Sequence, residues 1–303
     1  MDGLIPQFPE TVALGLEHKP ALDAALRATP SAASDLTFTN LYIWRHAYGA
    51  HLTRMGEVVC LLSLRADPEE SFLLPPLGTG ASAEHVLRCF ELMAQDEHNP
   101  RLCRATEPDL QRLGVGAEDF QVCTDRNNWD YVYRIADLTE LDPALYPEKV
   151  RHVERFAKRF PFEYRRITPD LVPGCQELQD LWCDDKHCDL HSSLRAEARA
   201  VNEVLANLDA LGVIGGAILV NDRVQAFSLG EPMNESTVVI HIEKATPDLH
   251  GAFQVINQQF LLHEWQGWEF VNREQDVGDP GLRKAKESYL PATMVEKRIA
   301  QAS

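Results

Sequence analysis

The positions of hydrophobic and polar residues predict the same succession of elements in each half of the chain. In the second half, apolar runs at 214–220 and 224–230 flank an Asn-Asp turn, a pattern typical of two strands joined in a β-hairpin. A strand at 238–242 follows, then a helix over 251–265 and a last strand at 269–272. The second half is therefore expected to form a small α/β module.

The first half repeats this order of patterns. A hairpin with its turn at a Met-Gly pair is followed by a short strand at 72–74, a helix over 83–95 and a strand at 102–105. A shift of 222 − 56 = 166 residues aligns the two hairpin turns and superimposes both series without gaps, although residue identity is negligible. The pattern predicts two copies of one module, and the alternative is chance agreement between common hairpin and helix patterns.

The segment between the two series is mainly helical in pattern. Alternation predicts a strand at 131–135, and helical spacing predicts helices over 147–160 and 193–211. The fold class is therefore α/β, with two tandem modules whose mixed sheets are flanked by helices. We expect the boundary near residue 140, which gives an N-terminal module of residues 1–140 and a C-terminal module of residues 141–303.

The charge balance limits the kinds of partner. Lysine and arginine number 29 against 46 aspartates and glutamates, so the formal charge is 29 − 46 = −17. Such an acidic chain is not expected to bind nucleic acid or an anionic membrane over its whole surface, so an anionic partner must contact a local basic patch. The 303 residues, 45% of them hydrophobic, suffice for about two domains.

Targeting signals and cysteine usage predict a cytoplasmic protein. The N-terminus lacks a basic segment followed by an apolar run, so it does not resemble a signal peptide. No run approaches the roughly 18 apolar residues that span a bilayer, so stable membrane insertion is not expected. The seven cysteines are scattered and odd in number, which favours reduced thiols over a disulfide framework.

One local basic patch is present, between residues 146 and 166. Its basic residues are Lys149, Arg151, Arg155, Lys158, Arg159, Arg165 and Arg166. Aromatic residues are interleaved with them, so the segment could contact the acceptor arm of a tRNA. Three glutamates lie in the same segment, and mixed charges on a helix more often form an ordinary solvated face.

A second chemical pattern is WCDDKHCDLHSS at 182–193. Cys183, His187 and His191 are spaced at i, i+4 and i+8, which would bring ligands suited to zinc onto one helical face. A second pair of ligands at zinc-finger spacing is lacking elsewhere. We therefore predict no metal site, and favour a polar helix face or one that lines the acceptor pocket.

The two copies differ in the chemistry of their strand ends. The second copy carries His241, Glu243 and Lys244 where the first has proline, leucine and glycine, and Asn272 and Arg273 where the first has threonine and glutamate. Charges near strand ends cost stability unless they are paired or used. The functional site is therefore expected in the second copy.

Four segments together resemble a known bacterial family. They are FTNLYIWR at 38–45, the stretch 215–245 that begins GGAILVNDRV, GAFQVINQQF at 251–260, and the stretch 271–298 that begins VNREQDVGDP. Through them the whole chain resembles a family of unknown function related to the C-terminal domain of phosphatidylglycerol lysyltransferases. The resemblance implies two GNAT-like modules in tandem. Its relatives transfer an aminoacyl group from charged tRNA to a lipid or, in Fem-type proteins, to a peptidoglycan precursor.

Two features depart from the pattern of those relatives. The transmembrane domain of the lysyltransferases is missing, which leaves a lipid acceptor open. GNAT enzymes that use acetyl-CoA carry a Gln/Arg-x-x-Gly-x-Gly/Ala loop before the helix, whereas residues 244–254 read KATPDLHGAFQ with one glycine. Acyl-CoA and aminoacyl-tRNA both remain as the implied donor.

The loop 244–251 is the candidate anion site. It lies between a strand and a helix start, where free N–H groups and the helix dipole favour a phosphate, and its glycine would let a ligand approach the backbone. The residues predicted to bind the donor here are Lys244, His250, Gly251 and Ala252. The alternative is that Asp248 caps the helix and Lys244 pairs with Glu243 or Glu274.

Polar residues at the ends of two strands are the candidate catalytic groups. Alternation would place His241 and Glu243 on one face of their strand, and Asn272 and Glu274 on one face of the next. The resemblance to GNAT folds implies that these strands splay apart and admit the acyl donor. His241, Glu243 and Glu274 are therefore candidates for taking a proton from an attacking amine.

The stretch 271–289 adds charges with two open interpretations. Arg273, Glu274 and Lys284 are expected to face the cleft, and Asn272, Arg273 and Lys284 complete the residues predicted to bind the donor. The alternative is a network of salt bridges that only ties the strands to the last helix.

The sequence leaves two candidate functions, which belong to different classes of protein. The first is a cytosolic acyl- or aminoacyltransferase that moves an acyl group from a phosphate-bearing donor, acyl-CoA or aminoacyl-tRNA, to an amine or hydroxyl. The sequence lacks the G-x-S-x-G, P-loop and H-E-x-x-H patterns, which favours direct transfer without a covalent enzyme intermediate. The second is a catalytically silent protein that binds a ligand through the same fold. The oligomeric state is left open.

Overall fold

The computed structural model describes residues 3–95, 98–116 and 118–303, and it divides into two compact units. Unit 1 comprises the residues up to Asp130 together with Gln275–Gly278 and Val295–Ser303. Unit 2 comprises Tyr131–Glu274 and Asp279–Met294. A single boundary near residue 140 does not describe this division, because the chain returns to unit 1 after residue 294 and adds a strand there.

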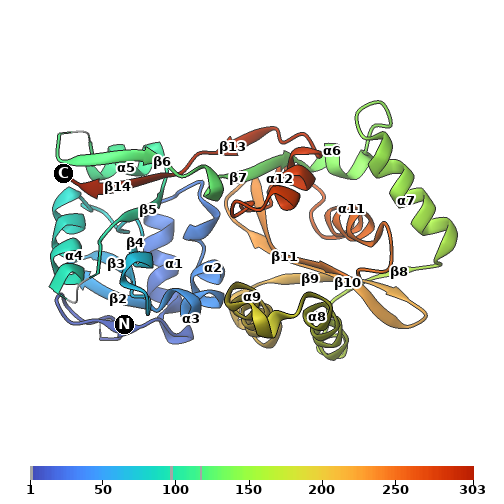
Figure 1. Cartoon of the computed structure of the whole chain (residues 1–303), viewed down its shortest axis with the longest axis horizontal. Helices are drawn as coiled ribbons and strands as arrows, with labels where there is room; N and C mark the ends of the chain where they lie inside the picture. Colours follow the sequence, from blue (N-terminus) through green and yellow to red (C-terminus); the bar gives the residue numbers. More distant parts are fainter. Residues whose placement is uncertain (1–2, 96–97, 117) are drawn as a thin grey trace. The chain divides into compact units, whose positions relative to one another are not determined.

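Unit 1 is built on a seven-stranded mixed sheet with the strand order β1-β2-β3-β4-β5-β14-β6 (Figure 1). Its strands are β1 (Val12–Ala13), β2 (Ala50–Met55), β3 (Val58–Ser63), β4 (Phe72–Leu73), β5 (Leu102–Ala105), β6 (Phe120–Thr124) and β14 (Arg298–Ala302). Its α-helices are α1 (Lys19–Ala28), α2 (Phe38–Ile43), α3 (Arg45–Tyr48), α4 (Ala83–Gln95) and α5 (Glu107–Leu113). The pair β4–β5 is parallel, and the other neighbouring strands of this sheet pair antiparallel.

Unit 2 is built on a second seven-stranded sheet, with the order β13-β7-β12-β11-β10-β9-β8. Its strands are β7 (Asp130–Arg134), β8 (Glu163–Arg166), β9 (Ile214–Val220), β10 (Arg223–Pro232), β11 (Thr237–Ala245), β12 (Phe270–Asn272) and β13 (Thr293–Val295). Its α-helices are α6 (Ile135–Glu140), α7 (Pro147–Arg159), α8 (Val172–Lys186), α9 (Ser192–Ala206), α10 (Leu208–Leu211), α11 (Ala252–Glu264) and α12 (Pro280–Glu287).

The two sheets share one strand order, which confirms the predicted tandem modules. The strands β1 to β5 correspond in order to β8 to β12, and in both sheets the fourth and fifth of these strands are parallel. The next position is filled in unit 1 by the C-terminal strand β14 and in unit 2 by β7, which directly follows unit 1 along the chain. Each sheet therefore includes one strand from elsewhere in the chain. Strand β14 follows β8 to β12 in sequence but lies in the sheet of unit 1, and β7 follows β1 to β5 but lies in the sheet of unit 2.

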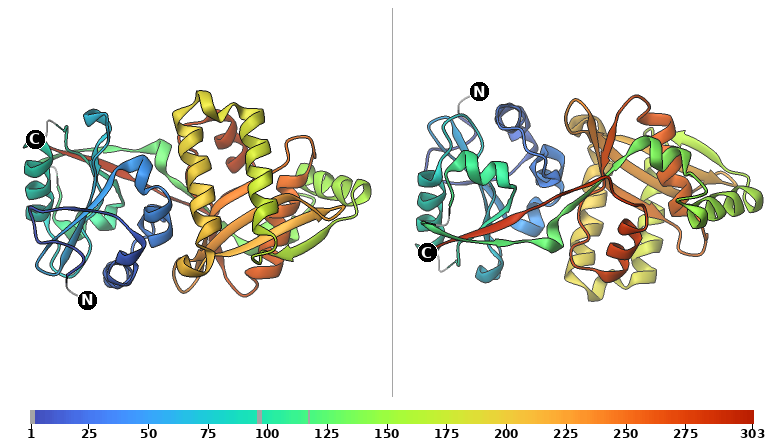
Figure 2. Two further views of the ribbon diagram at one scale, coloured as in Figure 1. Left: turned by 90° about the horizontal axis from the view of Figure 1, so that it is seen from below. Right: turned by 90° about the horizontal axis from the view of Figure 1, so that it is seen from above.

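The core of unit 2 lies between its sheet and α11. Helices α8 and α9 cover one face of the sheet and α11 covers the other (Figures 1 and 2). Val255, Ile256 and Phe260 of α11 are fully buried in one cluster with Val238 and Ile240 of β11. Each such side chain contributes roughly 1.5–3 kcal/mol by burial, so this layer holds β11 firmly in place.

Unit 1 contains a buried cluster of charges beside the points where the chain leaves and re-enters it. The ammonium of Lys297 is fully buried and contacts the carboxylates of Asp35 and Asp130. Ser34 donates from its backbone N–H and its hydroxyl to Asp130, at 2.8 and 2.9 Å. Arg104 Nε lies 3.3 Å from Asp35. These contacts join segments that are far apart in the sequence, and so fix where β14 enters the sheet.

Candidate functional site

Strands β11 and β12 of unit 2 pair only over the first three residues of each strand. Pairing is limited to Thr237–Val239 of β11 with Phe270–Asn272 of β12, while β11 continues to Ala245. The second half of β11 therefore has no β12 partner, and the polar residues of both strand ends lie where the two strands separate.

A β-bulge at His241 interrupts the expected alternation along β11. Leu229 pairs with Ile242 and Gly230 pairs with Ile240, so His241 has no partner on β10. A Cβ atom on Gly230 would lie 2.5 Å from the carbonyl oxygen of Val239, so only glycine permits this approach. The regular alternation that places His241 and Glu243 on one face therefore does not hold across the bulge.

His241 is held between two carboxylates. Its Nδ1 atom lies 2.8 Å from Glu274 Oε1 and its Nε2 atom lies 3.0 Å from Glu231 Oε1. The histidine side chain is fully buried. Burial by itself lowers the pKa of His241, but the hydrogen bonds to Glu231 and Glu274 outweigh it and raise the pKa to about 9. The imidazole is therefore a cation at neutral pH, with both nitrogens engaged as donors.

The raised pKa of His241 predicts a pH-dependent stability. A histidine with a folded-state pKa of about 9 and an unfolded value of 6.5 stabilises the fold fully below pH 6.5, and this contribution is lost as the pH rises through 9. The shift corresponds to about 3 kcal/mol. We expect the urea unfolding free energy of the wild type to fall more between pH 6.5 and 9.5 than that of His241→Gln. Parallel pH profiles of the two proteins would contradict this assignment.

Arg273 joins the ends of the two strands. Its Nη2 atom donates to Glu243 Oε1 at 2.9 Å, and the other carboxylate oxygen of Glu243 accepts from Asn257 Nδ2 at 3.2 Å. The guanidinium lies 5.7 Å from the ring centroid of Tyr133 and 5.1 Å from that of Tyr289. Burial opposes the charged form, but Glu243 and the two tyrosines raise the pKa of Arg273, which stays a cation.

One nitrogen of this guanidinium has no partner. Among the residues that the structure describes, Nη1 of Arg273 is buried and has no hydrogen-bond acceptor. A buried donor of this kind is normally satisfied by protein, water or a ligand, because leaving it unpaired costs about 1–3 kcal/mol. Nη1 of Arg273 is therefore a donor for which the described residues supply no acceptor.

Lysine and asparagine side chains shape the turn after β12. Asn272 is fully buried and its Oδ1 accepts the backbone N–H of Glu274 at 2.8 Å. Glu274 has a left-handed backbone with φ of +56°, which a non-glycine residue adopts only when its surroundings hold it there. Lys286 donates to the carbonyls of Arg273 and Glu274. Lys284, which we expected to face the cleft, is exposed on α12.

Lys244 lies on the other face of the sheet from α11. Its ammonium is 2.6 Å from Glu197 of α9 and 3.4 Å from the ring centroid of Trp182 on α8. Only 3% of the side chain is exposed, and burial lowers the pKa of Lys244. The expected partners, Glu243 and Glu274, point elsewhere. Lys244 therefore does not join His250 and Ala252 in one anion site at the start of α11.

Gly251 is required by the packing of α7 against the start of α11. It has φ of +98°, and a Cβ atom there would lie 2.7 Å from the carbonyl oxygen of His152 and 3.2 Å from Phe156 Cβ. The close approach at this glycine is thus made by α7. His250 beside it is exposed, and Ala252 begins the helix with its N–H bonded to the carbonyl of Leu249.

Substitution of Gly251 gives a test of this packing. Gly251→Ala is expected to lower the unfolding free energy by about 1–3 kcal/mol more than Gly267→Ala does. Gly267 has a similar φ of +92° but open space where its Cβ would lie, so the difference isolates the clash with α7. The measurement is urea unfolding followed by circular dichroism, and equal losses in the two variants would refute the clash.

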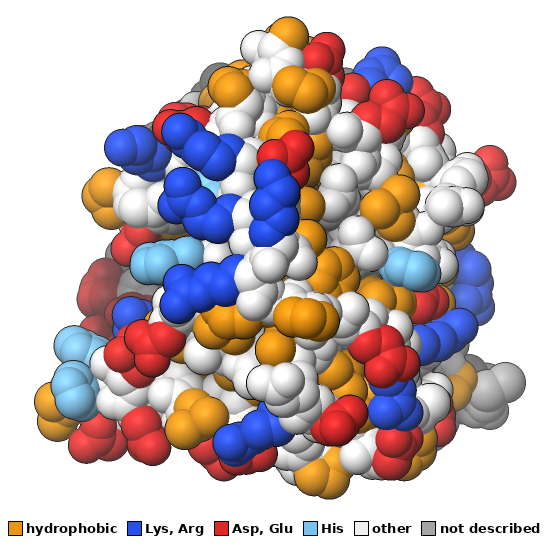
Figure 3. Space-filling model, turned by 90° about the vertical axis from the view of Figure 1, so that its right-hand side faces the viewer, with side chains coloured by type: hydrophobic (Ala, Val, Ile, Leu, Met, Phe, Trp, Pro, Cys, Tyr) orange, Lys and Arg blue, Asp and Glu red, His pale blue; other side chains and the backbone are white. Residues whose placement is uncertain are grey.

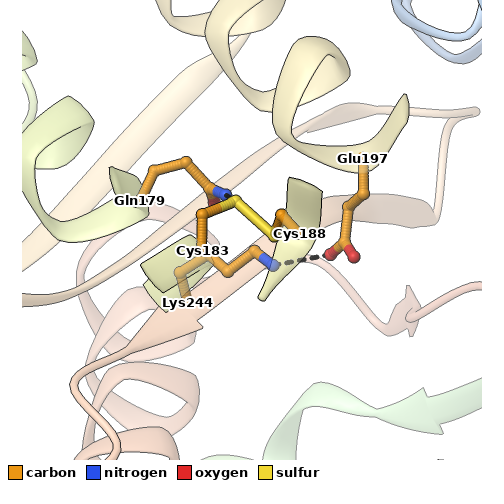
Figure 4. Close-up of a disulfide and its surroundings, with 5 residues drawn as sticks. All are labelled: Gln179, Cys183, Cys188, Glu197 and Lys244. Atoms are coloured by element: carbon orange, nitrogen blue, oxygen red, sulfur yellow. Dashed lines mark hydrogen bonds and ion pairs between the residues drawn. A yellow bond between two sulfur atoms is a disulfide. The ribbon is translucent and has the colours of Figure 1, made fainter. Parts of the chain in front are cut away.

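The predicted alignment of Cys183, His187 and His191 on one helical face is wrong. Helix α8 ends at Lys186, and His187 takes a left-handed conformation with φ of +52°, so the helical spacing stops there. Cys183 and Cys188 are joined by a disulfide (Figure 4). This differs from the reduced thiols that the sequence favours. The described residues contain no group of three or more potential metal ligands.

The basic patch divides between exposed and paired residues. Figure 3 shows lysine and arginine side chains gathered on one face of the molecule. Arg151, Arg155, Lys158 and Arg159 of α7 line a surface depression of about 350 Å³ together with Glu154. Two of these four also pair within α7, Arg151 with Glu148 and Lys158 with Glu154. The other three basic residues bind elsewhere in the chain: Lys149 to Ser288, Arg165 to Asp170 and Arg166 to Glu264.

The fold and the splayed strands define a class of protein. The units are tandem GNAT-like modules, and this is the fold of acyl- and aminoacyltransferases. The profile of the family described as phosphatidylglycerol lysyltransferase, C-terminal, matches residues 26–300. The chain belongs to this family. None of the helices in the described part of the chain has the length and apolar content to cross a membrane.

Solved structures share the fold. A conserved protein of unknown function from Bacteroides thetaiotaomicron is 31% identical, with a TM-score of 0.85 over 97% of this chain and 99% of that one. L-PGS from Bacillus licheniformis is 12% identical, with a TM-score of 0.62 over 98% and 93%. FemX is 10% identical, with a TM-score of 0.58 over 97% of each chain. No curated protein is similar enough to match.

Proposed function

We propose that unit 2 is the working unit of an acyl- or aminoacyltransferase, and that it binds the acyl group of its donor where β11 and β12 separate. The observation that carries the proposal is the buried Nη1 of Arg273, which lacks an acceptor and lies in the same side chain that holds Glu243. Family membership and the fold of aminoacyl-transferring relatives support the same class of reaction.

The proposed reaction uses the charged residues of this site in distinct roles. Arg273 Nη1 donates to the carbonyl oxygen of the acyl group and stabilises the negative charge that develops there. An amine or hydroxyl of the acceptor attacks the carbonyl carbon, and Glu243 takes its proton. The bond from the acyl carbon to the donor oxygen or sulfur breaks, the proton passes from Glu243 to that departing atom, and an amide or ester forms. Asn257 and Arg273 orient the Glu243 carboxylate.

His241 and Glu274 are proposed to position the site instead of carrying the proton. Both ring nitrogens of His241 are bonded to carboxylates, so neither can accept a proton from an acceptor without losing a partner. The imidazolium adds a fixed positive charge near the bulge of β11. Glu274 holds this cation and, through its left-handed backbone, ends β12 at the point where the strands separate.

The donor is proposed to be phosphate-bearing, as in aminoacyl-tRNA or acyl-CoA. The dipole at the start of α11 favours a phosphate beside the exposed His250, although the N–H of Ala252 is itself bonded to the carbonyl of Leu249. The exposed basic residues of α7 offer a local patch for the phosphates of a tRNA on an otherwise acidic chain. A tRNA donor requires this patch, whereas acyl-CoA does not.

A catalytically silent ligand-binding protein is the second candidate, and one observation favours it. Both oxygens of Glu243 and both nitrogens of His241 are already engaged in unit 2. A binding protein keeps such a network intact, whereas a transferase must release one Glu243 oxygen during each turnover.

Thermal stabilisation followed by turnover separates the candidates. The chain is heated with CoA, acetyl-CoA, uncharged tRNA and aminoacyl-tRNA, and the ligands that raise Tm are then supplied with amine and hydroxyl acceptors. A transferase is stabilised by one donor and consumes it, and Glu243→Gln keeps the stabilisation but slows turnover by about 100-fold or more. Stabilisation without turnover supports the silent protein, and no response to any donor refutes both the donor class and the transferase.

A further inference from the structure

The Cys183–Cys188 disulfide joins the last turn of α8 to the 3-10 turn η5 (Cys188–Leu190) that precedes α9. The two Cα atoms are 5.0 Å apart, within the range that disulfides require. Between them, the chain reverses at the left-handed His187. Arg195 of α9 donates to the carbonyl of Asp189 at 2.7 Å, so the reversal is tied to the next helix as well.

A groove between α8 and α9 leads to this disulfide. Its volume is about 680 Å³, and Cys188 lines it together with Gln176, Arg195 and Arg199. The two arginines outnumber Glu203, the one acidic residue of the lining, so the groove is positive on balance, although the chain as a whole is acidic. A small disulfide that carries carboxylates, such as glutathione disulfide, has the size and charge for such a groove.

Gln179 is suited to both oxidation states of the pair. The side chain is fully buried, its Nε2 atom donates to Cys183 Sγ at 3.3 Å, and its Oε1 atom has no partner among the described residues. A disulfide sulfur can only accept, so Oε1 stays unsatisfied while the disulfide is formed. A Cys183 thiol can donate, and rotation of the amide would then satisfy Oε1. That rotation turns Nε2 away from the sulfur, so Gln179 keeps one hydrogen bond to Cys183 in either oxidation state.

The disulfide lies over Lys244, the last charged residue of β11 (Figure 4). Lys244 is covered by Trp182, the residue before Cys183, and by Glu197, which follows η5 on α9. Both covering residues are thus attached to the segment that the disulfide closes. Loss of the crosslink frees this segment and uncovers the lysine at the end of the strand that carries His241 and Glu243.

We propose that Cys183 and Cys188 are a thiol–disulfide exchange site for anionic low-molecular-weight disulfides, and that the state of this pair controls access to Lys244. In oxidation, the Cys188 thiolate attacks the small disulfide, forms a mixed disulfide and releases one small thiol. The Cys183 thiolate then attacks the Cys188 sulfur and releases the second. Both cysteines lose a proton and together lose two electrons, which reduce the small disulfide to two thiols.

The exchange is tested by equilibrating the full chain in glutathione buffers of increasing oxidised fraction. After acid quenching, free thiols are alkylated and identified by peptide mass spectrometry. Cys183 and Cys188 are expected to lose alkylation together, while the buried Cys60 and Cys89 of unit 1 keep it. In Cys183→Ser, Cys188 is expected to carry glutathione. A pair that remains fully alkylated in the most oxidising buffer overturns the exchange site.

The control of Lys244 is tested by acylating the chain with a water-soluble amine-reactive ester. Labelling of Lys244 is expected to be several-fold higher in the reduced wild type and in Cys183→Ser/Cys188→Ser than in the oxidised wild type. The exposed Lys284 is the internal control and should not change. Equal labelling of Lys244 in both redox states overturns the proposal, and the wild-type comparison stands even where the double variant fails to fold.

Discussion

Lys297→Met is expected to lower the unfolding free energy by about 3–5 kcal/mol, because it leaves two buried carboxylates without their cation. Lys297 is fully buried between Asp35 and Asp130, and these carboxylates raise its pKa against the opposing effect of burial. Beside it, burial raises the pKa of Asp35 and the attraction of Lys297 and Arg104 lowers it, with a net lowering. The measurement is urea unfolding at neutral pH.

Two matched variants make this result specific. Lys284→Met removes an exposed lysine of α12 and is expected to change the unfolding free energy by less than about 0.5 kcal/mol. Lys297→Met/Asp130→Asn is expected to recover part of the loss, because one buried charge is removed with its cation. A Lys297→Met protein as stable as the wild type would show that the cluster does not hold β14 in the sheet of unit 1.

Arg273→Lys is expected to weaken binding of the stabilising acyl donor by roughly 10- to 100-fold. This loss of affinity corresponds to the free energy of one hydrogen bond to a charged group. Lysine keeps the charge that pairs with Glu243 but lacks the guanidinium fork, so it cannot hold Glu243 and a ligand oxygen in fixed directions together. Isothermal titration calorimetry with the donor found by thermal stabilisation gives the affinity.

The control for this variant is Arg166→Lys. Arg166 is a largely exposed arginine of unit 2 that pairs with Glu264, and its replacement is expected to leave donor affinity unchanged. Equal affinities of the wild type and Arg273→Lys would mean that Nη1 does not contact the donor, and would remove the observation on which the proposed function rests.

The tandem fold was predictable because hairpin and helix periods survive without residue identity. The shift of 166 residues places 72–74 on 238–240, and the structure has β4 and β11 at these positions. The places of β7 and β14 in the two sheets were not predictable. Alternation in β7 identifies a strand but does not show which sheet the strand joins. The strands β13 and β14 were missed because they are short or lie at the end of the chain with mixed polarity.

The candidate site was predicted in part. The structure pairs His241 with Glu274 and Arg273 with Glu243, so each pair joins β11 to the end of β12. Lys244 points to the opposite face from Glu243, as alternation between neighbouring residues requires, and the residue that the bulge displaces from this alternation is His241. The bulge has only a weak sequence signal, the single Gly230 in a strand.

The residues of other elements that bind the side chains of the site could not be predicted from the sequence. Glu231, Asn257 and Lys286 complete the ion pairs and hydrogen bonds of the site from β10, α11 and α12. Glu231 directly follows the glycine opposite the bulge, which is the one signal that could have identified it. Lys286 lies in the amphipathic helix α12, whose polar residues are ordinarily solvated, and Asn257 lies in the mainly apolar helix α11, whose pattern indicates core packing.

Hydrogen–deuterium exchange with and without the stabilising donor tests the central claim most directly, because it locates the ligand without substituting any residue. If the donor binds where the two strands separate, protection should appear at 241–246, at 251–256 and at 272–274 of unit 2. Protection confined to unit 1, or to α8 and α9, would contradict the account even if the donor stabilises the chain.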